Sequence, residues 1–190
     1  AFALGIFATS CSEKALQTEL VFDAKAQVGE GALWDLPTQR LYWIDIEGKT
    51  LHMYSPRNKK LDSYPMPDEI GTVVVIDSSK VLLALAHNLS EFNLETMELT
   101  EVLRPEIDAS SVRFNDGKCS PNGELWVGTM DLDTKNPIAA LYKIDNKYEI
   151  SKQLSNIAVS NGICWSPDGF TMYYIDSPTY SIQSFVFNKE

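Results

Sequence analysis

One layout of residues occurs three times along the chain and restricts the folds that it can form. An apolar run leads into a tight turn with proline or glycine, and a run rich in aromatic and β-branched residues follows. The copies cover residues 31–45, 116–130 and 161–176, and residues 71–76 form a weaker copy. A period of about 40–45 residues with several short strands per repeat is typical of β-propeller blades.

The repeats predict an all-β protein, and no window of the sequence has a convincing helical period. The blade-like units lie at residues 27–66, 69–106, 110–150 and 155–190. Each blade buries its faces against two neighbours, and propellers contain about four to eight blades. About four units are visible, and the last stops at Glu190 within its outer strands. We therefore expect residues 21–190 to be a partial β-propeller domain, a fragment whose C-terminal blades are missing.

The first residues resemble the end of an export signal. Residues 1–8 are apolar but too few to span a bilayer as a helix, and small residues precede Cys11. We interpret residues 1–11 as a truncated lipoprotein-type signal segment and residues 12–20 as a polar tether. This predicts an exported bacterial protein, in the periplasm or cell envelope rather than the cytoplasm, with a lipid anchor at Cys11. An ordinary secretory signal or an incorrectly defined N-terminus is the alternative.

Charge and motifs narrow the classes of function. The formal net charge is −10, which repels phosphate backbones, and no basic stripe is present, so we expect no nucleic-acid partner. Acidity suits a protein that binds a hard cation, although many proteins are acidic for solubility alone. The sequence contains no G-x-S-x-G, H-E-x-x-H or P-loop motif. Chemistry based on a nucleophilic serine, a zincin site or nucleotide hydrolysis therefore has no support.

Polar residues stand where apolar inner strands should begin. Glu30 lies between two glycines, Arg113 and Asn115 flank a phenylalanine, and Asn161 precedes a glycine. Inner strands line the central channel of a propeller, so side chains at their entry ends converge although they are far apart in sequence. The carboxylate of Glu30 and the amide oxygen of Asn161 are hard donors that suit Ca²⁺ or Mg²⁺ and are acceptable to Zn²⁺ or Mn²⁺.

Each of these residues also has a plainer interpretation. Glu30 could be a turn residue, and Asn161 with its following glycine is a common turn dipeptide. Arg113 could simply pair with Asp116 or Asp131. The pattern alone leaves both interpretations open.

Taken together, the segments resemble the senescence marker protein/gluconolactonase/luciferin-regenerating enzyme family, the regucalcin-like six-bladed propellers. The resemblance runs from about Val28 to Glu190. It is carried by residues 29–34, 113–118, 128–130, 160–162, 165–166 and 173–177. It implies a six-bladed β-propeller, of which this chain carries about four blades.

The resemblance also implies a site. The family binds one divalent cation at the top of the channel, most often Ca²⁺, and Glu30 and Asn161 match two of its ligands. Arg113 and Asn115 match side chains that hold the substrate, with Asn115 also close to the metal or its water. Asp133 falls where some members place a substrate-contacting glutamate with a longer side chain. The third ligand, an aspartate that also serves as the base, is expected beyond Glu190, so the catalytic residue is not identified in this chain.

The activity that the resemblance implies is divalent-metal-dependent hydrolysis of sugar lactones such as gluconolactone, with a metal-activated water attacking the lactone carbonyl. A non-catalytic propeller that binds calcium or another ligand is the alternative. A phosphotriesterase-like or other ester hydrolase on the same scaffold is a third hypothesis. The expected partner is a small sugar lactone, membrane contact is expected through the anchor at Cys11 alone, and a monomer is expected.

Overall fold

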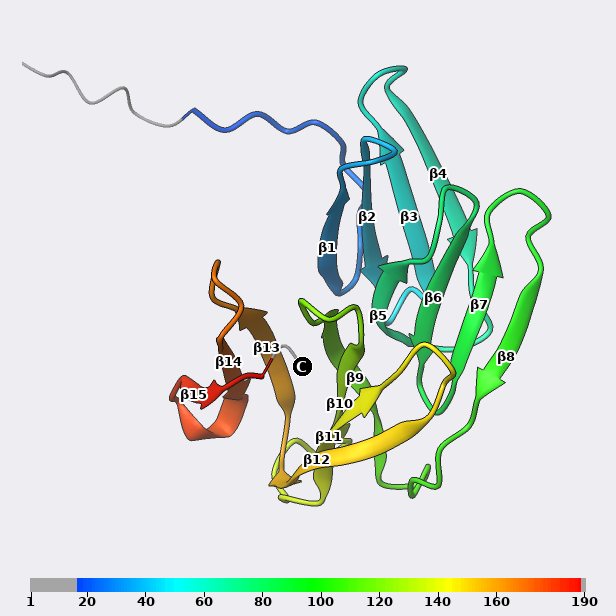
Figure 1. Ribbon diagram of the computed structural model, residues 1–190. Helices are drawn as coiled ribbons and strands as arrows, with labels where there is room; N and C mark the ends of the chain where they lie inside the picture. The colour runs from blue at the N-terminus through cyan, green and yellow to red at the C-terminus, as the bar shows by residue number, and fades with distance from the viewer. Residues whose placement is uncertain (1–16, 189–190) are drawn as a thin grey trace, which may run out of the picture.

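The computed structural model describes residues 17–188, and apart from one short 3-10 helix, η1 (Ser177–Thr179), its regular elements are all strands. The strands form four antiparallel sheets, each built from consecutive strands (Figure 1). This arrangement confirms the predicted all-β class with four propeller blades.

The sheets follow one another along the chain. The first contains β1 (Gly29–Asp35), β2 (Arg40–Asp45), β3 (Thr50–Ser55) and β4 (Lys60–Pro65). The second contains β5 (Ile70–Val75), β6 (Lys80–Leu85), β7 (Leu89–Asn93) and β8 (Leu99–Leu103). The third contains β9 (Val112–Cys119), β10 (Leu125–Asp131), β11 (Ala139–Ile144) and β12 (Ile150–Ile157). The fourth contains β13 (Ser160–Trp165), β14 (Thr171–Asp176) and β15 (Gln183–Val186).

The predicted boundary between the third and fourth blades is wrong. β12 pairs with β11 and continues to Ile157, so the third blade extends beyond residue 150. Of the eight residues of β12, all except Ile150, Leu154 and Ile157 are polar and exposed. An edge strand with one solvated face and few apolar residues gives a weak sequence signal.

Most of the N-terminal predictions concern residues outside the described range. Residues 1–11, with Cys11, lie outside the described residues, as do the first residues of the predicted tether. Residues 17–28 form no strand or helix, and the first strand begins at Gly29. Within residues 17–188 we find no helix with the length and apolar content that a membrane span requires.

Apolar packing between neighbouring sheets forms the core. Because successive side chains of a strand point to opposite faces, each sheet can contribute to two cores. In β6, Leu83 faces the first sheet and packs with Tyr42 and Leu51, whereas Leu82 and Ala84 belong to the core shared with the third sheet. A third core joins β10, β11 and β14. The stack of sheets is therefore continuous from the first blade to the fourth.

The first strand of each sheet lies on the inner side of the stack, where β5 lies beside β9 and β9 lies beside β13. Direct hydrogen bonds tie these strands and their neighbours together. Phe114 donates its backbone N–H to Ala86 O at 2.8 Å, and the Thr72 hydroxyl donates to Gly117 O at 2.9 Å.

Each of the four inner strands contains a β-bulge, at which it has one more residue between two paired positions than its partner strand has. The register shifts between Glu30 and Leu33, Ile70 and Thr72, Phe114 and Gly117, and Asn161 and Ile163. Gly31 and Gly162 stand at two of these bulges with φ of 63° and 61°, a backbone region that glycine adopts readily. A bulge changes the direction of nearby side chains, and it does so here at equivalent places in all four blades.

Gly71, the extra residue of β5, marks a close approach between two inner strands. A Cβ atom there would lie 2.6 Å from Asn115 O and 2.8 Å from Phe114 O. Both atoms belong to the backbone of β9, which cannot move without disturbing its own sheet.

We expect Gly71→Ala to lower the free energy of unfolding by about 3 kcal/mol, because the added methyl group overpacks two hydrogen-bonded strands. Urea denaturation of the wild type and the variant measures this loss. Gly29→Ala is the matched control, since the nearest atom to its added Cβ is the Ala26 Cβ at 3.3 Å. Equal stability of the two variants would contradict the close packing described for β5 and β9.

Candidate active site

The bulges of the inner strands surround a small polar cavity of about 210 Å³. Four of the residues singled out in the sequence line it together: Glu30, Arg113, Asn115 and Asn161. They come from β1, β9 and β13, and Gly71 of β5 completes the ring. Asp133 is exposed beyond the end of β10 and does not belong to the lining. The structure thus brings four of the five residues to one place, and their roles stay predictions.

Glu30 and Asn161 present oxygen atoms that accept no hydrogen bond in the part of the chain that the structure describes. Both residues are exposed. Asn161 donates through Nδ2 to Ser177 Oγ at 3.3 Å, and within residues 17–188 neither its Oδ1 nor the Glu30 carboxylate accepts a hydrogen bond. Unengaged carboxylate and amide oxygens in a shared cavity are the donors that a hard cation requires. Among the described residues, no three His, Cys, Asp or Glu side chains cluster as a metal site.

Arg113 is held rigidly at the edge of this cavity. Its Nε lies 3.2 Å from Glu69 Oε2, and its side chain is 13% exposed. Nη1 donates to Phe114 O at 2.8 Å and to Asn115 Oδ1 at 3.2 Å. Burial lowers the pKa of the guanidinium, while Glu69 and Glu47 act in the opposite direction. Arg113 therefore pairs with Glu69 and not with Asp116 or Asp131, the partners considered from the sequence.

Asn115 links two blades. It is buried, and its Nδ2 donates to Ser160 O at 2.7 Å across from β9 to β13. Its Oδ1 accepts from Arg113 and keeps one further lone pair. The amide thus fixes both the guanidinium beside it and the strand that carries Asn161.

Asp116 stabilises the bulge that follows Asn161. Its Oδ2 accepts the backbone N–H of Gly162 at 2.7 Å, and its Oδ1 accepts that of Gly117 at 2.8 Å. Burial raises the pKa of the Asp116 carboxyl, the two backbone N–H groups oppose this shift, and the nearby charge of Glu30 adds to it. No local pattern in the sequence indicates this role for Asp116.

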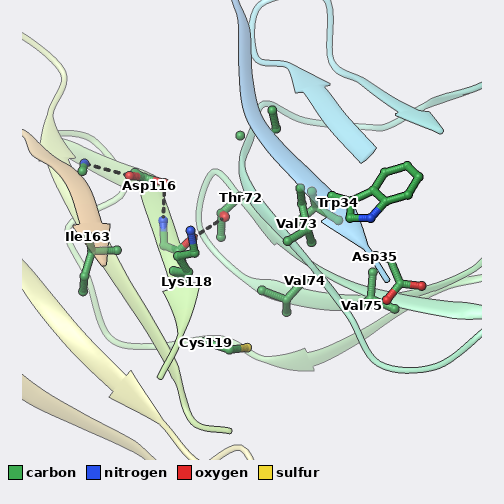
Figure 2. A pocket seen from close by; sticks show the side chains of 15 residues that line it. Trp34, Asp35, Thr72, Val73, Val74, Val75, Asp116, Lys118, Cys119 and Ile163 are labelled. Carbon is green, nitrogen blue, oxygen red and sulfur yellow. Dashed lines mark hydrogen bonds between the residues drawn. The ribbon is translucent and has the colours of Figure 1, made fainter. Parts of the chain in front are cut away.

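A second, larger cavity of about 400 Å³ shares Gly31 and Asp116 with the first. Figure 2 shows its lining, to which Trp34, Val73 and Ile163 contribute apolar surface. The dashed lines in Figure 2 include the hydrogen bonds of Asp116 and Thr72. Polar ligating groups therefore gather in the smaller cavity, whereas the adjoining space is mainly apolar.

Two buried aspartates hold the segments that lead to Glu30 and Asn161. Asp45 accepts the backbone N–H groups of Gln27 and Val28 at 2.9 and 3.0 Å. Asp176 accepts the N–H of Val159 at 2.8 Å and that of the residue before it. Sequence reasoning missed both functions. The sequence does contain a signal for this role, because each of the two aspartates is the last residue of the second strand in its repeat.

Four consecutive sheets with two carboxylates, an arginine and two amides around one inner cavity define a β-propeller protein with a candidate polar site. The chain belongs to the SMP-30/Gluconolactonase/LRE-like family, whose model matches residues 28–190. This confirms the resemblance seen in the sequence.

Individual relatives agree with this assignment. L-arabinolactonase of Azospirillum brasilense is 33% identical over 165 residues, which cover 85% of this chain and 55% of the relative. Regucalcin of Xenopus laevis is 29% identical over 174 residues, or 89% of this chain and 58% of the relative. The crystal structure of a calcium-binding protein, regucalcin, from Agrobacterium tumefaciens superposes with a TM-score of 0.81 and 27% identity, covering 86% of this chain and 55% of that one. The chain therefore spans little more than half the length of these relatives.

The contacts of Asp45 lead to a prediction about pH. Burial would raise the pKa of its carboxyl, but hydrogen bonds from the backbone N–H groups of Val28, Gln27 and Gly48 outweigh this effect, and the pKa is lowered. A lowered pKa stabilises the folded state above the pKa of the unfolded chain, and the contribution is lost as the pH falls through the folded value.

We expect Asp45→Asn to cost about 2 kcal/mol of unfolding free energy at pH 7, since the carboxylate no longer accepts charged hydrogen bonds from partly buried backbone N–H groups. The difference from the wild type should narrow as the pH is lowered towards 3. Urea denaturation across this pH range tests both statements. Asp23→Asn, an exposed residue that accepts one 3.3 Å hydrogen bond from Lys25, is the control. A loss that is the same at every pH would contradict the charged role of Asp45.

Proposed function

We propose that the protein containing this chain hydrolyses sugar lactones with the help of a divalent cation. One observation carries the proposal: Glu30, Asn161 and Arg113 line the same cavity although they come from separate blades. Family membership and the similarity to L-arabinolactonase support lactone chemistry. Ester hydrolysis needs stabilisation of the charge that develops on the carbonyl oxygen, and such a cavity can provide it.

Glu30 and Asn161 would hold the cation, through the carboxylate and through Oδ1. Calcium is the preferred ion, because it favours oxygen ligands of this kind, and a relative of known structure is described as a calcium-binding regucalcin. When bound, such a cation supplies Lewis acidity towards a carbonyl and lowers the pKa of water. The base and the third ligand stay predictions for an aspartate beyond Glu190.

Arg113 and Asn115 would orient the sugar. The guanidinium is fixed by Glu69, Phe114 and Asn115 before any ligand arrives, so little side-chain entropy is lost on binding. Its remaining N–H groups can donate to a ring hydroxyl or to the ester oxygen. Placing a substrate in a defined orientation is a large part of what an active site contributes to rate.

We expect Glu30→Gln to reduce kcat/KM for D-glucono-1,5-lactone by about 100- to 1000-fold, the effect of removing one preorganised electrostatic group. Wild-type hydrolysis should also be lost after exhaustive chelation and return on addition of CaCl₂. Initial rates measured by acid release with and without EDTA test this. Glu98 is an exposed residue next to β8. Glu98→Gln removes the same charge as Glu30→Gln and is the control.

Two outcomes would contradict the proposal. The first is hydrolysis that survives both chelation and Glu30→Gln. The second is calcium binding by the wild type without turnover of any sugar lactone, which would favour a non-catalytic binding protein.

A further inference from the structure

The backbone on both sides of Asn161 is held by side chains of the neighbouring blade. On the N-terminal side, Ser160 O accepts a hydrogen bond of 2.7 Å from Asn115 Nδ2. On the C-terminal side, the Gly162 N–H donates to Asp116 Oδ2, also at 2.7 Å. The two side chains are consecutive in β9, and the three residues that they hold begin β13. The position of Asn161 therefore depends on β9.

The contact with Asp116 lies at the bulge of β13. Gly162 is the extra residue between the paired positions Asn161 and Ile163, and the extra residue of a bulge is left out of the regular ladder of hydrogen bonds. Its N–H thus needs another acceptor, and the carboxylate of Asp116 provides one. The other carboxylate oxygen accepts the Gly117 N–H at 2.8 Å, which fixes the carboxylate in place. Hydrogen bonds to a charged acceptor are stronger than those between neutral groups.

The side chain of Asn161 is restrained much less than its backbone. The residue is exposed, and within residues 17–188 its side chain makes one hydrogen bond, from Nδ2 to Ser177 Oγ at 3.3 Å. A group that must become ordered when a ligand binds loses affinity through the entropy of that ordering. Since the side-chain contact is long and exposed, the order of Asn161 comes mainly from the backbone contacts on either side of it.

We propose that Asp116 is a positioning residue for the cation. By holding the N–H of Gly162, it keeps Asn161 Oδ1 at the place where one cation can be shared with Glu30. This inference rests on the proposed function, because the cation is part of that proposal. Asp116 acts through the β13 bulge and needs no contact of its own with the cation or the lactone.

Two measurements on the same variants of the protein containing this chain test the proposal. Asp116→Ala removes both acceptor oxygens, and we expect it to raise the Kd for Ca²⁺ by about tenfold in calorimetric titrations with CaCl₂, the scale of one charged hydrogen bond. In the metal-free protein, the amide hydrogen of Gly162 should exchange with solvent faster than in the wild type, because exchange reports local opening. Asp116→Asn keeps the shape of the side chain and one acceptor, so both changes should be smaller, and it replaces Asp116→Ala if that variant does not fold.

Asp145→Asn is the matched control. Asp145 accepts the backbone N–H groups of Lys147 and Glu149 at 2.8 and 2.9 Å, in the turn between β11 and β12, and it does not line the cavity. This variant loses the same charge and the same kind of contact as Asp116→Asn, so we expect lower stability with the calcium affinity of the wild type.

Three results would overturn the role of Asp116. The first is a calcium affinity that is unchanged in the Asp116 variants. The second is an equal loss of affinity in Asp145→Asn. The third is weaker calcium binding with unchanged exchange at Gly162, because this would show that Asp116 acts through its charge and not through the position of the bulge.

The proposed function can fail separately from this inference. A wild type that binds Ca²⁺ but hydrolyses no sugar lactone would contradict the lactonase proposal, and the calcium affinities of the variants would still support or overturn the role of Asp116. Lactone hydrolysis with equal calcium affinities in all variants would overturn this inference alone. A wild type that binds no Ca²⁺ would overturn both the proposed cation and the role of Asp116.

Discussion

Packing between the faces of neighbouring sheets is the interaction on which the rest of the structure depends. Each shared core combines alternate side chains from two consecutive blades, and this packing brings the inner strands into backbone contact. At Gly71 the contact leaves no space for a Cβ atom. The polar side chains of Glu30, Asn115 and Asn161 stand beside the bulges of these strands, which is where the candidate site lies.

The repeats made the blades predictable because strands such as β6 and β11 are largely apolar segments bounded by turns. β11 begins and ends where the apolar run does, at Ala139 and Ile144. β12 was not located correctly because its sequence is mostly polar, and it is recognised as a strand through pairing with β11 rather than through its own composition. Outer strands with a solvated face carry less information in a single sequence.

For the candidate site, the motifs identified the residues that line the cavity but not the residues that fix those side chains in place. Glu30, Arg113 and Asn161 stand out because a polar group interrupts an apolar segment. The pairing of Glu69 with Arg113 joins different blades and has no local pattern in the sequence. The role of Asp45 is partly predictable, since the repeat alignment places it at the end of a strand but does not show which backbone N–H groups donate to it.

The equivalent bulges have an evolutionary consequence. In each blade the residue next to the bulge occupies an equivalent position, and the apolar cores that stabilise the fold lie elsewhere on the sheets. A substitution at residue 30 or 161, both exposed, can thus change the lining of the cavity with little effect on stability. The polar lining of the cavity can therefore be altered one blade at a time, without repacking the cores between the sheets.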